Sequence, residues 1–159
     1  MNSKNRDEAE LPAFVDTPCW KVSPPLDFSE FLRQLPRLLP PDSILYAAGT
    51  PVHEVEAYLL ARPSVYENRL STGVFGLRAK GFYMPATEAN LRGFADIAEN
   101  FAEPEVCDHL HVYRNNQAIL HWYDLPADHF YVSTTTDENS LRDVCQTLGC
   151  HYELETESC

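Results

Sequence analysis

Four residues in the C-terminal half of the chain have side chains that bind transition metals and a spacing that could group them. They are Cys107, His109, His111 and Asp124. Alternate side chains of a β-strand lie on one face, so the C-x-H-x-H spacing of the first three predicts a common face. A zinc or iron ion held there could activate a water molecule as a Lewis acid. The alternative is that both histidines are half-buried packing residues, because an H-x-H pair alone has low specificity.

A predicted β-hairpin must position these residues. Residues 109–114 and 117–124 have the pattern of two strands around the dipeptide Asn115-Asn116, and asparagine tolerates the positive φ of a type I′ turn. If Arg114 pairs with Gln117 and the ladder stays regular, Cys107 comes opposite Asp124. The same register gives two further pairs, His109 with Trp122 and His111 with Leu120. A slip by one residue would disperse the metal-binding set, so this hypothesis depends on the register.

A second group of candidates lies in the irregular segment 62–82, which contains four cations and one acid. Arg69, Arg78 and Lys80 could bind a phosphate or carboxylate, helped by backbone N–H groups near Gly73 and Gly76. The segment matches neither the G-x-G-x-x-G pattern nor the P-loop, so it predicts no nucleotide site. The alternative is that these cations neutralise acidic residues at the surface.

The third candidate is an aromatic and acidic surface for a partner protein. Its residues are Trp122, Tyr123, Asp124, Asp128 and Tyr131. Residues 83–159 hold 14 acids and three arginines, a net charge of −11. Aromatic side chains rimmed by acids favour contact with a basic protein surface. The alternative is that the aromatic residues form ordinary core packing on one face of a sheet.

Composition excludes several classes of function. The 159 residues include 24 acids and 12 bases, so the net charge of −12 argues against nucleic acid and against membranes as partners. No segment has the length and apolar character of a membrane span, and the first residues lack the pattern of a secretory signal peptide. We therefore expect a cytoplasmic protein whose five cysteines are reduced, with Cys145 and Cys150 as packing residues. No complete catalytic motif such as G-x-S-x-G is present, so an enzyme is not the favoured class, and no cofactor is expected.

Helix and strand signals alternate along the chain. Helices are predicted from about residue 27 to 35, 50 to 61, 87 to 101 and 137 to 148, with Thr87 and Asp137 as N-caps and Gly149 as a terminator. Strands are predicted at 43–48, 81–84 and 151–154, and at 109–134 as an antiparallel meander. The expected fold is α/β or α+β, a mixed sheet with about four packed helices. Residues 1–26 contain four prolines and are expected to form a loosely ordered, partly docked arm, followed by a single globular domain at 27–159.

These features lead to one favoured function and two alternatives. The favoured hypothesis is a small non-catalytic binding or interaction module that presents its acidic, aromatic face to a basic partner. The first alternative is a metal-dependent enzyme or sensor that uses the C-x-H-x-H face. The second alternative is a small-anion binding protein that uses segment 62–82.

Overall fold

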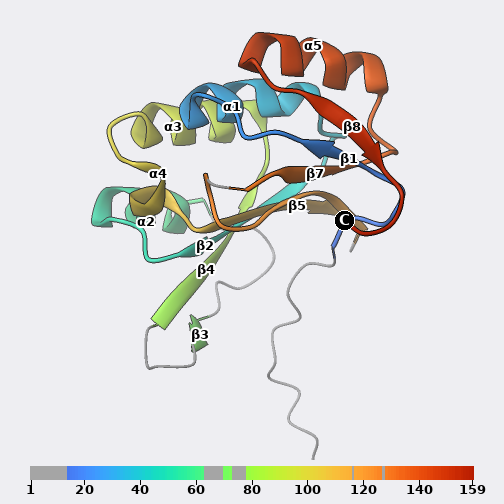
Figure 1. Ribbon diagram of the computed structural model, residues 1–159. Coiled ribbons are helices and arrows are strands. Elements are labelled where there is room, and N and C mark those ends of the chain that lie inside the picture. The colour runs from blue at the N-terminus through green and yellow to red at the C-terminus, as the bar shows by residue number, and fades with distance from the viewer. Residues whose placement is uncertain (1–13, 63–69, 73–77, 116, 127) are drawn as a thin grey trace, which may run out of the picture.

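The fold is an antiparallel sheet with helices packed on one of its faces (Figure 1). The computed structural model describes residues 14–62, 70–72, 78–115, 117–126 and 128–159, with the backbone alone at 70–72 and 78–80. The described strands are β1 (Cys19–Val22), β2 (Ile44–Gly49), β3 (Leu70–Thr72), β4 (Arg78–Pro85), β5 (His109–Arg114), β6 (Gln117–Trp122), β7 (Phe130–Ser133) and β8 (Tyr152–Glu155). Their order across the sheet is β3-β4-β2-β5-β6-β7-β1-β8.

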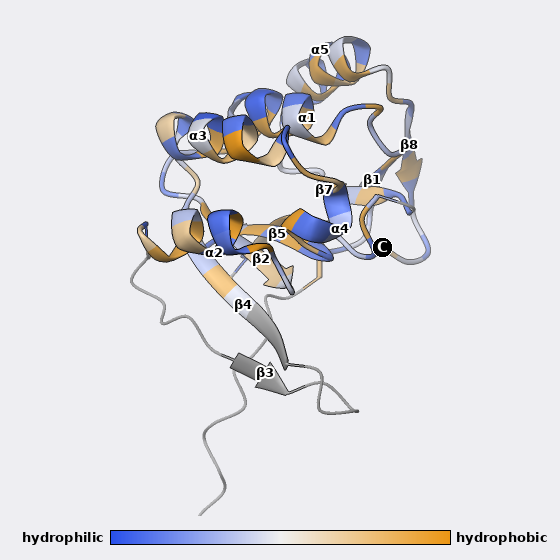
Figure 2. Ribbon diagram, turned by 90° about the vertical axis from the view of Figure 1, so that its left-hand side faces the viewer, coloured by the Kyte–Doolittle hydropathy of each residue, from blue (hydrophilic) through white to orange (hydrophobic). Residues whose placement is uncertain are grey.

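Five α-helices and one 3-10 helix complete the described part of the chain. They are α1 (Phe28–Gln34), η1 (Leu35–Arg37), α2 (His53–Leu60), α3 (Glu88–Ala98), α4 (Glu103–Val106) and α5 (Glu138–Leu148). Figure 2 shows α1, α3 and α5 on the same side of the sheet. The main core lies between these helices and the sheet, where Phe31, Phe94 and Trp122 are fully buried. We call the other side of the sheet the opposite face.

Local sequence signals explain where the helices begin and end. The side chains of Asp27, Thr87 and Asp137 accept hydrogen bonds from the backbone N–H groups of the first turns of α1, α3 and α5. Gly149 ends α5 in the left-handed conformation, with φ of 69°, which glycine adopts without steric cost. The predicted caps Thr87, Asp137 and Gly149 are therefore confirmed. The short helix α4 is the additional element beyond the four predicted helices.

The α+β class is confirmed, but the predicted mixed sheet is wrong, because every described strand pair is antiparallel. The reason lies between β2 and β4. The chain leaves β2, passes through α2 and then forms β3, which pairs with β4 as an antiparallel partner. This extra reversal returns β4 to the sheet in the direction opposite to β2.

The N-terminal arm was also predicted to be less regular than the structure shows. Residues 19–22 form β1, which lies inside the sheet between β7 and β8. Val15 is buried just before it, so the arm is docked from this point onward. Residues 1–13 lie outside the described part of the chain.

Candidate functional site

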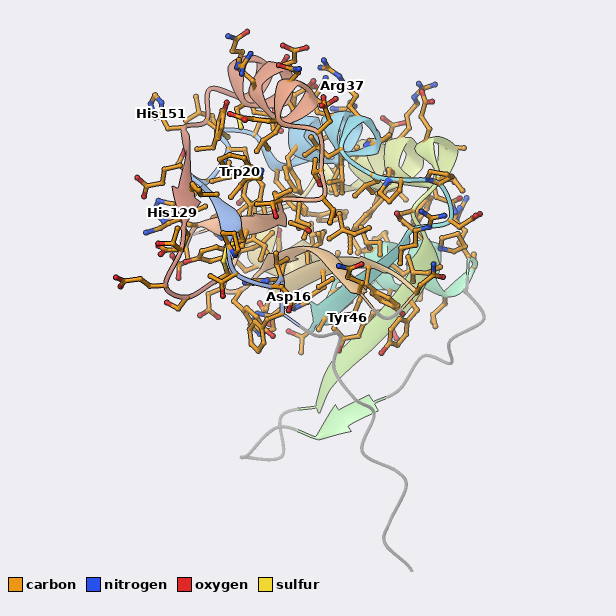
Figure 3. The ribbon with its side chains drawn as sticks, turned by 90° about the vertical axis from the view of Figure 1, so that its right-hand side faces the viewer. Asp16, Trp20, Arg37, Tyr46, His129 and His151 are labelled. Carbon is orange, nitrogen blue, oxygen red and sulfur yellow. A yellow bond between two sulfur atoms is a disulfide. The ribbon has the colours of Figure 1, made fainter. Side chains whose placement is uncertain are left out.

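One register row brings tyrosines and histidines together on the opposite face of the sheet. Strand pairing aligns, in order from β4 to β8, Tyr83, Tyr46, His111, His121, Tyr131, Lys21 and Glu153. Because side chains alternate along each strand, all seven belong to the face that the helices do not cover. Figure 3 shows Tyr46 and Asp16 on the side of the sheet away from Arg37 and the helices. We call this set the tyrosine–histidine row.

A β-bulge in the β5–β6 hairpin creates the centre of this row. Arg114 pairs with Gln117 as predicted, but the register shifts between Val112 and Tyr113. One extra residue on β6 moves every later pair by one position, so His111 faces His121 instead of Leu120. The same shift pairs Trp122 with Leu110 instead of His109. The regular ladder predicted from the sequence is therefore wrong beyond the first pairs.

The rings in the row form a continuous chain of contacts. Ring centroids are 4.8 Å apart for Tyr46 and Tyr83, 5.9 Å for Tyr46 and His111, and 6.1 Å for His111 and His121. The row continues to Tyr131, whose ring centroid lies 4.9 Å from that of His121. All four ring pairs are tilted, and aromatic contacts at these distances stabilise a fixed arrangement. The row is therefore an ordered layer on the opposite face.

Burial keeps the two central imidazoles neutral. His111 is 2% exposed, and burial, helped by the nearby His121 and His109, lowers the pKa of its imidazole to about 3. Burial also lowers the pKa of His121 to about 4, and the Nδ1 atom of this residue accepts a hydrogen bond from the backbone N–H of Val15 at 3.0 Å. The Nδ1 atom of His111 has no hydrogen-bond partner among the described residues. Burial raises the pKa of Tyr46 to about 12.

An exposed patch lies beside the buried part of the row. Phe14 is 57% exposed, and its ring centroid lies 5.3 Å from that of Tyr123. On the same face, the ring centroid of His109 lies 5.0 Å from that of Tyr123. Asp124 and the partly exposed Tyr131 complete the group. We call Phe14, His109, Tyr123, Asp124 and Tyr131 the Phe14 patch.

The backbone at Asp124 fixes the acidic edge of the Phe14 patch. Asp124 follows the end of β6 with φ of 52°, a left-handed conformation that aspartate tolerates better than most residues. Its N–H donates to Nδ1 of His109 at 3.2 Å. Its carboxylate is 81% exposed and forms no ion pair with a described lysine or arginine. An aromatic surface therefore carries an accessible negative charge at its border.

The predicted metal-binding set does not form. Cys107 lies at the C-terminal end of α4, not in β5, and its side chain is buried in the main core on the helix side of the sheet. Burial raises the pKa of this thiol well above its usual value, which disfavours the thiolate that a metal requires. Among the residues that the structure describes, no group of three or more His, Cys, Asp or Glu side chains is placed to hold a metal ion. The predicted register and the assignment of Cys107 to a strand were both wrong.

The residues of the predicted partner surface lie on two sides of the sheet, and the predicted anion site lies outside the described residues. Trp122 is fully buried in the main core, where its Nε1 donates to the carbonyl of Asp128 at 2.9 Å, so it cannot contact a partner. Tyr123, Asp124 and Tyr131 lie on the opposite face, and the side chain of Asp128 is exposed in the β6–β7 turn. The anion-binding prediction lies outside the described residues, since Arg69 is not described and Arg78 and Lys80 are described by their backbone alone.

Sequence reasoning missed two features of this face. The first is the pair Tyr46 and Tyr83, which lie in two strands that the sequence predicted. Each tyrosine alternates with apolar neighbours along its strand, so the two-residue period of a strand could have assigned both to the opposite face. The disulfide between Cys19 and Cys159 had no local signal, because the two residues are 140 positions apart. The prediction that all cysteines are reduced is wrong for this pair. Cys107, Cys145 and Cys150 are free and buried.

Searches against protein-family models, curated proteins and solved structures found no match. No helix in the described part of the chain has the length and apolar character needed to cross a membrane.

Proposed function

We propose that the protein is a non-catalytic binding module whose Phe14 patch receives a basic segment of a partner protein. The observation that carries the proposal is the exposed Phe14, which packs on Tyr123 beside the exposed carboxylate of Asp124. Exposed aromatic groups with a charged border are typical of protein interfaces. The patch keeps Tyr123, Asp124 and Tyr131 from the sequence prediction and adds Phe14 and His109.

The chemistry of the patch suits lysine and arginine side chains. The faces of Phe14 and Tyr123 attract a cation through the ring quadrupole. The exposed carboxylate of Asp124 can pair with the same cation, and Asp16, two residues after Phe14, is a further exposed acid. The net charge of −12 attracts a basic partner over longer distances and raises its rate of association.

The histidines of the tyrosine–histidine row support binding rather than acid–base catalysis. A catalytic base is most effective when its pKa lies near the working pH. The pKa values of His111 and His121 are about 3 and about 4, so both imidazoles are weak bases at neutral pH. Their ring contacts instead support Tyr123, whose ring centroid lies 4.8 Å from that of His111 and 5.9 Å from that of His121.

A binding experiment with a lysine- and arginine-rich peptide tests the proposal. We expect Tyr123→Ala and Asp124→Asn each to weaken binding roughly tenfold, because each removes one main contact of the cation. The matched control is Asp143→Asn on α5, which removes the same charge on the helix side of the sheet. Isothermal titration calorimetry at low and high salt gives the dissociation constants.

Two outcomes would contradict the proposal. Equal weakening by Asp124→Asn and Asp143→Asn would mean that only the overall charge matters. Affinity that does not change with salt would mean that ionic contacts do not contribute.

A further inference from the structure

Strand β8 forms one border of the sheet. It pairs with β1 on one side, and no other described strand lies on its second side. Figure 1 shows β8 beyond β1 at this border. A border strand presents backbone N–H and C=O groups that an added strand can pair with. The features of β8 therefore determine which strand could be added.

The hydrogen bonds to β1 show which backbone groups of β8 point outward. The N–H of Ser23 donates to the carbonyl of His151 at 2.9 Å, immediately before β8 begins. In an antiparallel ladder, residues that bond to the neighbouring strand alternate with residues that do not. With the pairing of Val22 to Tyr152 and of Trp20 to Leu154, the N–H and C=O groups of Tyr152 and Leu154 point away from β1.

The two sides of this border differ in their side chains. Leu154 is 50% exposed on the helix side, where its register partner is Trp20. The ring of Tyr152 lies on the same side, and its centroid is 5.6 Å from that of the Trp20 ring. Glu153 and Glu155 alternate with them and lie on the opposite face. The border is thus apolar on one side and acidic on the other.

The acidic side disfavours a second copy of the chain paired antiparallel about Leu154. Two β8 strands paired antiparallel about Leu154 would place Glu153 of each copy opposite Glu155 of the other. Like charges directly opposite each other destabilise a strand pair. A strand with cations at the alternate positions would instead pair with both carboxylates, and its other side chains would meet Leu154.

We propose that the β8 border binds an extended segment of a partner protein in which lysine or arginine alternates with apolar residues. The segment adds to the sheet as a further strand, held by backbone hydrogen bonds to Tyr152 and Leu154. Its cations face Glu153 and Glu155, and its apolar side chains cover Leu154. This surface is separate from the Phe14 patch and does not depend on it.

The test uses a short peptide of alternating valine and lysine, with an alternating valine and glutamate peptide as its charge-reversed control. Leu154→Pro removes one outward N–H and keeps the hydrogen bonds to β1, because proline is tolerated where the N–H faces solvent. We expect this variant to bind the lysine peptide at least about tenfold more weakly. Leu154→Ala keeps the N–H, so it should weaken binding much less, and the glutamate peptide should not bind.

Hydrogen exchange on the unaltered protein gives an independent measurement, which is decisive even if Leu154→Pro fails to fold. The bound lysine peptide should slow exchange of the Tyr152 and Leu154 amides more than that of the Glu153 and Glu155 amides. Equal binding by Leu154→Pro and the unaltered protein, or no selective protection of those two amides, would overturn the proposal. Selective protection of the Tyr152 and Leu154 amides reports on the β8 border alone, and the effect of Tyr123→Ala reports on the Phe14 patch alone. Failure of one surface therefore leaves the measurement on the other surface unchanged.

Discussion

At the scale of single residues, the most unusual feature is a pair of facing histidines buried beneath aromatic rings. His111 and His121 occupy one register pair on the opposite face, and both are almost completely removed from solvent. Burial of a cationic imidazole is costly, so the folded protein holds both in the neutral form. The cost of protonating them makes the stability of the fold depend on pH.

We expect the free energy of unfolding to decrease as the pH falls from about 6.5 to 4. In this window the unfolded chain binds protons on both histidines, with an ordinary pKa of about 6.5, whereas the folded protein does not because their pKa values are about 3 and about 4. Since the unfolded state binds more protons, acid favours it, at about 1.4 kcal/mol per pH unit for each histidine. Urea unfolding curves at several pH values measure this slope.

His111→Phe should reduce the slope by the contribution of one histidine, because phenylalanine keeps the ring and removes the proton site. His53→Gln is the matched control, since His53 is exposed at the start of α2, and it should keep the slope of the unaltered protein. An unchanged slope in His111→Phe would show that other groups cause the acid sensitivity.

The sequence predicted the residues of this site better than their arrangement. The hairpin, its turn and the common face of His109 and His111 follow from local patterns. The bulge does not, because β5 also pairs with β2 and β6 also pairs with β7, and local patterns do not contain these pairings. Phe14 joined the site only because β1 docks into the sheet, which also required information from distant strands.

At the scale of elements, α5 shows how much a local signal can determine. Its first turn is held by Asp137, whose carboxylate accepts hydrogen bonds from the N–H of Ser140 at 2.9 Å and from the hydroxyl of the same residue at 3.0 Å. Such capping pairs are readable in sequence because donor and acceptor are three residues apart. Strand β1 is the opposite case, since its partners β7 and β8 come from the other end of the chain.

Asp137→Ala should therefore lower the free energy of unfolding by about 1 kcal/mol, through loss of the cap at α5. Asp137→Asn keeps an oxygen acceptor and removes the charge, so it should cost much less. Thermal or urea unfolding of both variants measures the difference. Equal destabilisation by the two substitutions would assign the effect to charge and not to the capping hydrogen bond.

At the scale of the whole molecule, one covalent bond joins the two ends of the described chain. Cys19 in β1 and Cys159 form a disulfide, and Cys159 packs against the cluster of Val15, Cys19 and Ala118. A cross-link between residues so distant in sequence restricts the unfolded chain strongly. The bond also anchors the arm that places Phe14 in the Phe14 patch.

Reduction of this disulfide should lower the free energy of unfolding by about 2–4 kcal/mol. Cys159→Ser should show the same loss without reductant, because it removes the same cross-link. Adding reductant to Cys159→Ser is the internal control and should cause no further change. Melting temperatures with and without reductant measure these effects. If reductant destabilised Cys159→Ser as much as the unaltered protein, the cross-link would not be the cause.

The disulfide also makes residues 19–159 a closed covalent ring. A protease that cuts this ring once opens it without releasing a fragment from it. The two pieces stay attached and migrate as one species in an electrophoresis gel until a reducing agent separates them. For the same reason, damage to a single peptide bond inside the ring leaves β1 and the C-terminal residues of the same molecule tethered to each other.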